Sequence, residues 1–453
     1  MGAGKSTIGQ EVATSSGRPF VDLDREIERR HGPIVDIFRR GEPEFRRIEE
    51  ELVAEVLASP TPAVIALGGG AVLSERTRDL LVADAFTVWV DVDPTEAWER
   101  VGDSGRPLAQ DPEQFRRLFD ERRPLYETVS AALVQDAEAV LLQALRITVE
   151  RGVLAKLGNR LGASPDGVAV IADEHVLELH PLSFDPASVH RVPRGEAAKT
   201  PAVLDRLWTE LELDRSGTVV GYGGGSTTDV AGLAAATYLR GVRWIAVPTT
   251  LLGQVDAAIG GKTAVDLPAG KNLAGAFHYP AGVIVDPDVL ATLSDAQRRE
   301  GMAEVVKTGL LADRPIWELE EEAMIRACAA FKAAVCIGDP FDNGRRAILN
   351  LGHTFAHALE TAAGYQELSH GDAVSLGLLA ALRLSGRATD VVEEVLRVTP
   401  ARVDRGRAWA ALQRDKKAQR GELRLVLLGE DGPVVETRPA TEVRAALDEL
   451  IAD

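Results

Sequence analysis

Histidine and carboxylate side chains that could hold a metal ion gather in the C-terminal third of the sequence. His353 and His357 are four residues apart in LNLGHTFAHALE, so they would share one face of a helix, and His370 follows in LSHGDAV. Upstream, GMAEVVKTG offers Glu304. Histidine and carboxylate ligands that leave a fourth position open are typical of a catalytic Zn²⁺ site. A solvated or packed histidine pair explains the same spacing without a metal, so both interpretations stay open at this point.

A glycine-rich turn that follows an apolar run could bind a phosphate. GTVV leads into GYGGGSTTDVAG, where Gly223, Gly224 and Gly225 would let the backbone approach a pyrophosphate. The pattern is not G-x-G-x-x-G with an acidic residue about 20 residues later. The nearest acid that could hold a ribose, Asp173 in VAVIADE, comes earlier instead. A glycine turn that binds no ligand is consistent with the same sequence. The neighbouring motifs must therefore distinguish a nucleotide-binding turn from an ordinary one.

The opening residues, MGAGKSTIGQ, contain the end of a second phosphate-binding signal. Gly4, Lys5 and Ser6 match the close of the P-loop pattern G-x-x-x-x-G-K-S/T, in which backbone N–H groups wrap phosphates and the hydroxyl holds Mg²⁺. Asp22 and Asp24 in FVDLD end an apolar run, and we expect them on the same side of a strand. Such a pair could hold a metal ion or a substrate hydroxyl. A chance Gly-Lys-Ser, with the aspartates in a turn or a helix cap, is the alternative.

Alternating apolar runs and helical stretches must position these residues. Up to about residue 145, PAVIALGGG and FTVWVDVD alternate with helical patterns, which predicts a parallel α/β sheet. VAVIADE, GTVVGYGGG, VRWIAVPTT and AGVIVDP mark a second α/β region. From about Leu290 helical periodicity and alanine take over, and LRLVLLG and PVVETRP are expected to form a late strand pair. The fold class is therefore α/β, with predicted domains over residues 1–145, 146–290 and 291–453.

Composition and charge restrict the classes of partner. At 453 residues two or three domains are expected, and no apolar run approaches the roughly 18 residues of a membrane helix. No signal peptide precedes the first motif, and the two cysteines, Cys328 and Cys336, are too few for a disulfide framework. We therefore expect a cytoplasmic enzyme without a membrane partner. The net charge of −18 argues against a nucleic-acid partner. Anionic small substrates remain possible, because the Debye length of about 8 Å screens the field of the whole chain. Nearby lysines and arginines then determine whether an anion binds.

Longer stretches around the glycine turn and the histidines resemble 3-dehydroquinate synthase. They are RGVRWIAVPTTLLGQVDAAIGGKTAVDLPAGKNLAGAFHYP, EGMAEVVKTG, RRAILNLGHTFAHALE, HGDAV and DKK, and the resemblance runs from about residue 146 to 453. It implies an NAD-binding α/β domain followed by a mainly helical metal-binding domain, with the active site in the cleft between them. A homodimer through this half is a further expectation.

The resemblance assigns roles to residues at matching positions. The Zn²⁺ (or Co²⁺) ligands would be Glu304, His353 and His370, while His357 resembles an active-site histidine that is not a ligand. NAD⁺ would contact Asp173, Lys199, Gly224, Gly225, Asp229, Thr249, Thr250 and Leu252. The substrate would meet Arg240, Asp256, Lys262, Lys271, Asn272, Lys307, Lys332, Arg346, Asn350 and a lysine of DKK, taken as Lys416. Among these, Lys262, Lys307, Arg346, Asn350 and His357 are the expected catalytic residues.

The implied reaction converts 3-deoxy-D-arabino-heptulosonate 7-phosphate to 3-dehydroquinate and phosphate. NAD⁺ would oxidise the C5 hydroxyl while Zn²⁺ polarises its oxygen, and phosphate could then leave. NADH would reduce the ketone again before ring opening and aldol closure, so the overall conversion is redox-neutral.

The first region resembles shikimate kinase over essentially all of residues 1–145. After the Gly-Lys-Ser motif and FVDLD, it carries EPEFRRIEE, ALGGGA, GRPL and RRPLY in that order. The resemblance implies that Gly2, Gly4, Lys5, Ser6 and Thr7 bind ATP, that Ser6 and Asp22 lie at Mg²⁺, and that Asp24 binds and activates the acceptor hydroxyl. Shikimate would meet Arg46, Gly68, Gly69, Gly70, Arg106 in a mobile lid, and Arg122.

The sequence departs from both families at a few positions. In the synthase half, Asp372 and Asp342 stand where glutamate is usual, and Ala356 stands where glycine is common. In the kinase half, the strand that leads into the P-loop would lie before Met1. We therefore expect Met1 to be an internal residue and the match of Met1-Gly2-x-x-x-Ser6 to the myristoylation pattern to be accidental. Losing about four buried aliphatic side chains would cost roughly 6–12 kcal/mol, so a kinase that began at Met1 should be compromised.

Alternative functions remain open from the sequence. The chain could be an active synthase that carries a non-catalytic kinase-like module, or a related NAD/Zn sugar-phosphate cyclase or polyol dehydrogenase. The phosphate-facing residues argue against the dehydrogenase, because a simple alcohol has no phosphate to bind. A lipid-anchored peripheral protein is the alternative from another class. The leading hypothesis is one chain with both shikimate-pathway activities.

Overall fold

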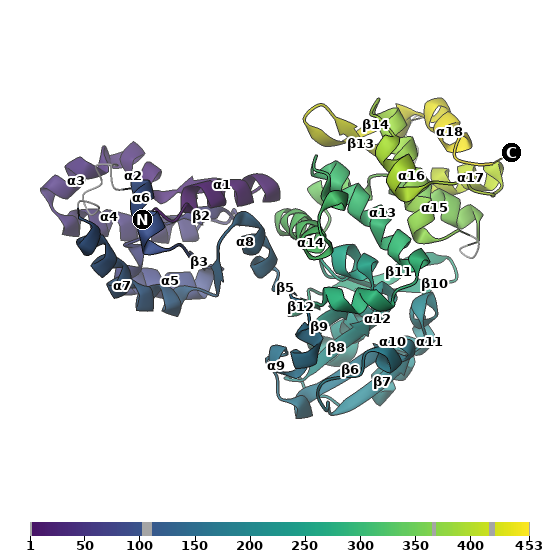
Figure 1. The fold of residues 1–453 in the computed structure, drawn as a ribbon, viewed down its shortest axis with the longest axis horizontal. Helices are drawn as coiled ribbons and strands as arrows, with labels where there is room; N and C mark the ends of the chain where they lie inside the picture. Colours follow the sequence, from purple (N-terminus) through teal and green to yellow (C-terminus); the bar gives the residue numbers. More distant parts are fainter. Residues whose placement is uncertain (1, 102–110, 365–367, 416–421, 453) are drawn as a thin grey trace. The chain divides into compact units, whose positions relative to one another are not determined.

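The computed structural model describes residues 2–101, 111–364, 368–415 and 422–452. The chain divides into two compact units, Met1–Ala144 and Leu145–Asp453, and each is described by itself. Both units mix helices with parallel strands, so the predicted α/β class is confirmed (Figure 1).

The strands of the first unit form two separate parallel pairs. β1 (Phe20–Asp22) pairs with β2 (Val64–Ala66), and β3 (Val88–Val90) pairs with β4 (Ala132–Val134). Within the described residues, neither β2 nor β3 has a strand partner on its second edge. A cavity of about 110 Å³ lies between them, lined by Leu67 and Gly68 after β2, by Thr87–Val90 and by residues of α7. The sheet of this unit is therefore open along its middle.

Helices cover this open sheet. They are α1 (Lys5–Ser16), α2 (Leu23–His31), α3 (Ile34–Arg40), α4 (Glu42–Leu57), α5 (Glu75–Asp84), α6 (Pro94–Val101), α7 (Pro112–Val129) and α8 (Ala137–Ala144). In α4, Phe45, Ile48 and Leu52 recur at three- and four-residue steps and are buried. This helical spacing places one apolar stripe against Leu23 and Ile27 of α2, so that α2 and α4 share a small core.

The second unit contains a six-stranded parallel sheet in the order β5-β12-β9-β8-β6-β7. The strands are β5 (Ile147–Val149), β6 (Val168–Asp173), β7 (Ser188–Val192), β8 (Thr218–Gly223), β9 (Arg243–Pro248) and β12 (Gly282–Val285). Every residue of β6 and β8 is buried, as is expected for central strands covered on both faces. The helices of this part are α9 (Leu157–Arg160), α10 (Glu174–Leu179), α11 (Pro201–Glu210) and α12 (Gly225–Thr237).

A mainly helical part follows from residue 287. It contains α13 (Asp295–Leu311), α14 (Glu321–Gly338), α15 (His353–Ala362), α16 (His370–Leu384), α17 (Arg405–Asp415) and α18 (Ala440–Asp448). The hairpin β10 (Lys262–Leu267) and β11 (Gly270–Phe277) precedes it. The predicted late strand pair is confirmed as the antiparallel hairpin β13 (Glu422–Gly429) and β14 (Gly432–Pro439).

Among the described residues, the helices are too short or too polar for any of them to cross a lipid bilayer.

The open middle of the first unit's sheet predicts uneven hydrogen exchange along the chain. Amides of β2 and β3 face an edge without a strand partner, whereas β6 and β8 are paired on both sides. We expect exchange in Val64–Ala66 and Val88–Val90 to be at least about tenfold faster than in Val168–Asp173 and Thr218–Gly223. Hydrogen exchange followed by mass spectrometry on the intact chain measures this difference. Equal protection in the two sets of strands would show that β2 and β3 are paired in solution.

Candidate active sites

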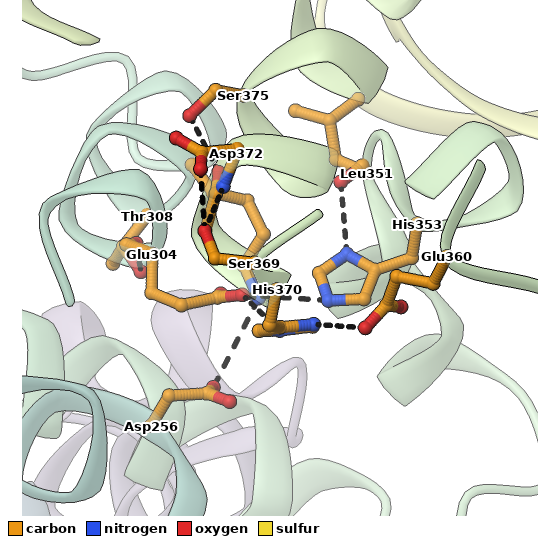
Figure 2. Close-up of polar contacts among 12 residues, drawn as sticks. Asp256, Glu304, Thr308, Leu351, His353, Glu360, Ser369, His370, Asp372 and Ser375 are labelled. Atoms are coloured by element: carbon orange, nitrogen blue, oxygen red, sulfur yellow. Dashed lines mark hydrogen bonds and ion pairs between the residues drawn. The ribbon is translucent and has the colours of Figure 1, made fainter. Parts of the chain in front are cut away.

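Three helices bring one carboxylate and two imidazoles together in the second unit. Glu304 lies in the middle of α13, His353 is the first residue of α15 and His370 is the first residue of α16. Glu304 Oε1 is 3.4 Å from His353 Nε2 and 3.5 Å from His370 Nε2 (Figure 2). One donor atom from each of the three residues lies within 4.8 Å of the other two. This separation allows a single ion to contact all three donors.

Glycines let α13, α15 and α16 approach one another closely enough for the two histidines to reach Glu304. A Cβ on Gly371 would lie 2.4 Å from Cα of Glu300, so α16 begins almost against the backbone of α13. A Cβ on Gly377 would lie 2.1 Å from the carbonyl oxygen of Gly352, which caps the start of α15. Side chains at these two positions would push the helices apart. The two histidines therefore depend on glycine contacts to reach Glu304.

The remaining ring nitrogens of the two histidines have partners of different kinds. His353 Nδ1 lies 3.2 Å from the carbonyl oxygen of Leu351, and His370 Nδ1 lies 3.5 Å from Glu360 Oε1. An Nδ1–H that faces an acceptor leaves Nε2 free as a ligand. Both rings are thus oriented with Nε2 toward Glu304.

The environment of Glu304 fits a bound cation. Its side chain is 1% exposed, and neither carboxylate oxygen accepts a hydrogen bond within the described part of the chain, although the ammonium of Lys307 lies against Oε2. Burial raises the pKa of the Glu304 carboxyl, but Lys307 and His353 outweigh it and hold the pKa well below its usual range. A buried, ionised carboxylate needs a compensating cation; Lys307 serves Oε2, whereas Oε1 faces the two imidazoles, where a metal ion could bind. Two imidazoles and one carboxylate are also a donor set that suits a divalent transition metal.

The two histidines differ in their protonation. Burial lowers the pKa of His353, which favours the neutral ring that a metal requires. Burial also acts to lower the pKa of His370, but the carboxylates of Glu304 and Glu360 raise it to about 10. A cation beside Glu304 would compete with this protonation.

Lysines surround the carboxylates of the cluster. Lys307 is 2% exposed, and its ammonium also lies 3.9 Å from Asp256 Oδ1. Lys332 Nζ of α14 lies 2.8 Å from the same Asp256 oxygen. Asp256 belongs to the π-helix η6 (Gly253–Ala257), which follows β9, so the α/β part and the helical part meet here. The structure thus brings the predicted Asp256, Lys307 and Lys332 next to the predicted metal ligands.

The residues expected to contact NAD⁺ gather at the carboxyl ends of β6, β8 and β9. Asp173 ends β6 and caps α10, with Oδ1 accepting from the His175 backbone N–H at 2.9 Å. Gly224 caps α12, and a Cβ there would lie 3.1 Å from Thr250 Cγ2. Ligands of parallel α/β sheets bind at this edge. Gly225 begins α12, Thr249 and Thr250 follow β9, and Leu252 caps η6.

A polar chain links this edge to the hairpin β10–β11. Lys199 Nζ donates to Asp229 Oδ2 at 2.7 Å and also to Asn272 Oδ1. Burial raises the pKa of Asp229 to about 6, although Lys199 opposes this effect. The next residue before Asn272 is Lys271, whose Nζ lies 3.5 Å from Glu360 Oε1. The predicted Lys199, Asp229, Lys271 and Asn272 therefore form one connected set.

The other predicted residues of this half lie beside the cluster or in other parts of the unit. Arg346 is 2% exposed and donates Nη2 to the Gly260 carbonyl at 2.8 Å, and Lys262 pairs with Asp342. His357 is exposed, and its ring centroid lies 5.6 Å from that of His353 in an edge-on contact. Arg240 is exposed at the end of the 3₁₀ helix η5 (Tyr238–Arg240), and Asn350 is the last residue of the 3₁₀ helix η9 (Arg345–Asn350). Lys416 lies outside the described residues.

In the first unit, a glycine turn runs into the start of α1. Gly2 and Gly4 have φ of 72° and 81°, and α1 begins at Lys5. Backbone N–H groups at a helix start favour anions, and the left-handed glycines allow the tight approach. Ser6 Oγ donates to Asp22 Oδ2 at 2.6 Å, so the two residues expected at Mg²⁺ lie together. Thr7 follows them on the first turn of α1.

One prediction about the aspartates is wrong. Asp22 ends β1 and caps α2, with Oδ1 accepting from the Arg25 backbone N–H at 3.3 Å. Asp24 is therefore on the first turn of α2, not on the same side of a strand as Asp22. The Asp22 cap starts the helix at Leu23, so the strand ends two residues before Asp24, where the alternation of FVDLD had placed it. Asp24 still reaches the site, because a Cβ on Gly68 would lie 3.1 Å from its Oδ1.

The glycines after β2 leave room for charged side chains. A Cβ on Gly70 would lie 2.3 Å from Arg46 Nη1, so only glycine admits the guanidinium there. Arg46 Nη1 donates to Glu49 Oε2 at 2.6 Å, and burial raises the pKa of Glu49 although Arg46 opposes it. Arg122 is 5% exposed, and its Nε has no hydrogen-bond partner within the described residues. Gly69 accepts at its carbonyl from the Tyr126 hydroxyl at 2.6 Å. Arg106 lies outside the described residues.

Three charged or polar residues of these sites escaped the sequence analysis. Glu360 contacts His370 and Lys271, Glu49 contacts Arg46, and Tyr126 contacts the Gly69 carbonyl. Helical spacing could have indicated the first two: Glu360 is three residues after His357, and Glu49 is three residues after Arg46. Tyr126 ends RRPLY, one helical turn after Arg122.

Comparisons with known proteins match both halves of the chain to known families. Family models described as shikimate kinase, 3-dehydroquinate synthase N-terminal and 3-dehydroquinate synthase C-terminal match residues 1–150, 189–300 and 301–418. The 3-dehydroquinate synthase of Enterococcus faecalis is 36% identical over 340 residues, which cover 67% of this chain and 95% of the relative. The bifunctional shikimate kinase/3-dehydroquinate synthase of Thermotoga maritima is 33% identical over 407 residues, which cover 83% of this chain and 82% of the relative.

Two solved structures resemble the synthase half. A 2-deoxy-scyllo-inosose synthase complexed with carbaglucose-6-phosphate, NAD⁺ and Co²⁺ has a TM-score of 0.60 and 25% identity, covering 67% of this chain and 96% of that one. A 2-epi-5-epi-valiolone synthase from Streptomyces hygroscopicus with NAD⁺ and Zn²⁺ bound has a TM-score of 0.56 at the same identity and coverage. The chain therefore belongs to the 3-dehydroquinate synthase family and, like its Thermotoga maritima relative, joins a shikimate kinase and a 3-dehydroquinate synthase in one polypeptide.

Proposed function

We propose that the second unit converts 3-deoxy-D-arabino-heptulosonate 7-phosphate to 3-dehydroquinate and phosphate with NAD⁺ and Zn²⁺ or Co²⁺. The observation that carries this proposal is the convergence of Glu304, His353 and His370, which place one donor atom each within 4.8 Å of one another. The resemblance to synthases solved with NAD⁺ and with Co²⁺ or Zn²⁺ supports it. When bound, the metal would polarise a substrate oxygen and NAD⁺ would accept and return a hydride.

The residues of this chain would hold and orient the substrate around that centre. Lys307 and Lys332, held by Asp256, present two ammonium groups beside the metal ligands. Lys271 and Asn272 offer a second polar edge from the hairpin. We assign the neutralisation of the substrate's carboxylate and phosphate to these groups, which supply local positive charge despite the net charge of −18. We further assign substrate or catalytic roles to the remaining predicted residues: Arg240, Lys262, Arg346, Asn350, His357 and Lys416.

The dinucleotide would lie along the carboxyl ends of β6, β8 and β9. Gly224 and Gly225 would admit the pyrophosphate at the start of α12, and Asp173 would take a ribose hydroxyl. Lys199, Asp229, Thr249, Thr250 and Leu252 would complete this site. This arrangement corresponds to an NAD-binding domain over residues 146–290 and a metal-binding domain over residues 291–453.

We propose that the first unit phosphorylates the 3-hydroxyl of shikimate with ATP and Mg²⁺. Lys5 would reach the phosphates, and Ser6 and Asp22 would lie at Mg²⁺, which their 2.6 Å contact supports. Asp24 would accept the proton of the substrate hydroxyl. Arg46, Arg122 and Arg106 would bind the carboxylate and phosphate groups, because guanidinium forks match both.

The open sheet supports a second candidate function for this unit. The cavity between β2 and β3 is lined by Lys5 and Arg122, two of the residues that phosphoryl transfer would need in place. A non-catalytic kinase-like module is therefore the alternative for residues 1–144. Shikimate-dependent ATP turnover by the purified chain distinguishes the two functions.

The Glu304→Gln substitution tests the metal site. The amide keeps the shape of the side chain but removes the anionic ligand, so we expect kcat/KM for dehydroquinate formation to fall at least about 1,000-fold. Bound Zn²⁺, measured by elemental analysis, should fall in parallel. Shikimate phosphorylation by the same preparation is the internal control and should not change. Normal dehydroquinate formation by the variant would overturn the assignment of Glu304.

Chelation gives an independent test of the same centre. Dialysis against a strong transition-metal chelator, followed by an assay in excess Mg²⁺, should abolish dehydroquinate formation. Added Zn²⁺ or Co²⁺ should restore it, because both ions suit the same ligands. Full activity of a preparation shown to be metal-free would contradict the proposed function.

The Asp24→Asn substitution tests the kinase assignment. Loss of the proton acceptor should lower kcat for shikimate phosphorylation about 100-fold or more, and dehydroquinate formation should stay at the parent level. Asp36→Asn is the matched control, since Asp36 is an exposed aspartate of the same unit whose Oδ1 lies 2.7 Å from Arg39. An unsubstituted chain without shikimate-dependent ATP turnover would favour the non-catalytic module.

A further inference from the structure

A buried carboxylate behind the metal-ligand cluster has no role in the function proposed above. Glu360 lies on α15, and its side chain is 4% exposed. Its Oε1 lies 3.5 Å from His370 Nδ1 and 3.5 Å from Lys271 Nζ. One oxygen therefore faces a predicted metal ligand and a predicted substrate-binding lysine at the same time.

The helix places Glu360 where it can serve both groups. His353, His357 and Glu360 recur at steps of four and three residues, so they occupy one face of α15. The side chains of His353 and Glu360 lie beside His370, the first residue of α16 (Figure 2). Since α15 also supplies His353, a single helix carries one metal ligand and the carboxylate that contacts another.

The two histidine ligands are oriented by different means. His353 Nδ1 faces the backbone carbonyl of Leu351, which any side chain at that position would provide. His370 Nδ1 faces the side chain of Glu360, so its orientation depends on one residue's identity. A carboxylate behind a metal-bound histidine fixes the tautomer and makes the ring a stronger ligand.

Lys271 is anchored through its neighbour as well as through Glu360. The backbone N–H of Asn272 donates to Asp266 Oδ1 at 2.8 Å, and Asn272 Oδ1 accepts from Lys199. These contacts hold the turn of the hairpin independently of Glu360. Removal of the Glu360 carboxylate would therefore remove this contact of the Lys271 ammonium without releasing the hairpin.

We propose that Glu360 is a positioning residue that fixes His370 as a metal ligand and holds Lys271 beside the same centre. The inference rests on the proposed metal site formed by Glu304, His353 and His370. It assigns Glu360 an effect on metal affinity, through His370, and an effect on substrate binding, through Lys271. Neither effect requires Glu360 to contact the metal or the reacting atoms.

The test compares the variants Glu360→Ala and Glu360→Gln with the unsubstituted chain. The first readout is Zn²⁺ affinity, measured by competition with a chromophoric chelator, and the second is the visible absorption of the Co²⁺-loaded protein. We expect Zn²⁺ binding to weaken about 10- to 100-fold, with a changed Co²⁺ spectrum in both variants. In steady-state assays with saturating metal, KM for the heptulosonate phosphate should rise more than kcat falls.

Glu449→Gln is the matched control. Glu449 lies in the same unit, is exposed, and has Oε2 3.0 Å from Arg383 Nη1, so this substitution removes one negative charge away from the cluster. It should leave Zn²⁺ affinity, the Co²⁺ spectrum and KM at the parent values. Thermal unfolding of all variants shows whether Glu360→Ala is folded. Should it fail to fold, Glu360→Gln, which keeps the side-chain volume, decides the outcome.

The possible outcomes separate this inference from the proposed function. An unsubstituted chain that binds no Zn²⁺ or Co²⁺ would overturn the metal site and this inference with it. A chain that binds one equivalent of metal, with folded Glu360 variants within twofold of its affinity, would overturn the role of Glu360 alone. Weaker binding with an unchanged KM would contradict the link to Lys271.

Discussion

The carboxylate of Glu304 sets the main constraint on the second unit. It lies inside a helical core with its side chain 1% exposed, where an ionised group without compensation is strongly destabilising. Lys307 on the same helix offsets this negative charge, and His353 and His370 face it from the starts of two other helices. The close contacts at Gly371 and Gly377 bring those helix starts within reach. The glycine contacts of the core and the charged centre therefore depend on each other. The charge of Glu304 requires the histidines nearby, and the histidines reach it only because the helices are close.

The first unit meets a different constraint, which is the pairing of strand edges. Parallel strands are normally buried inside a sheet, and an unpaired edge exposes N–H and C=O groups. In this unit β2 and β3 border a cavity, while the charged residues Asp24, Arg46 and Arg122 lie on helices. Ser6 on α1 contacts Asp22 at the end of β1, whereas Arg46 and Glu49 lie on the same helix. Site geometry in this unit therefore depends on the position of β1 against α1 as well as on contacts within one helix.

The sequence predicted residues of both sites but not the side chains that contact and orient them. Spacing alone offered His353, His357, His370 and Glu304, and the resemblance to 3-dehydroquinate synthase selected Glu304, His353 and His370 as the ligands. It missed Glu360, because a glutamate three residues after His357 has the same pattern as an ordinary exposed helical glutamate. The burial that distinguishes Glu360 arises from the packing of α15 against α16 and the hairpin, which no local pattern encodes. Asp24 was misplaced for a related reason: two residues of alternation fit a strand and the first turn of a capped helix equally well.

The distribution of charge explains how an acidic chain can handle several anions. Three of the lysines expected to bind substrate or NAD⁺ are buried. Lys307 and Lys332 lie against Asp256, and Lys199 lies against Asp229. Each buried ammonium is held by a carboxylate, so its position is fixed before a substrate arrives and little reorganisation is needed on binding. Each pair of a lysine and a carboxylate is neutral overall, so these pairs leave the net charge of −18 unchanged. The net charge of the chain therefore does not determine the local charge at its sites, because the excess of acidic residues lies outside these pairs.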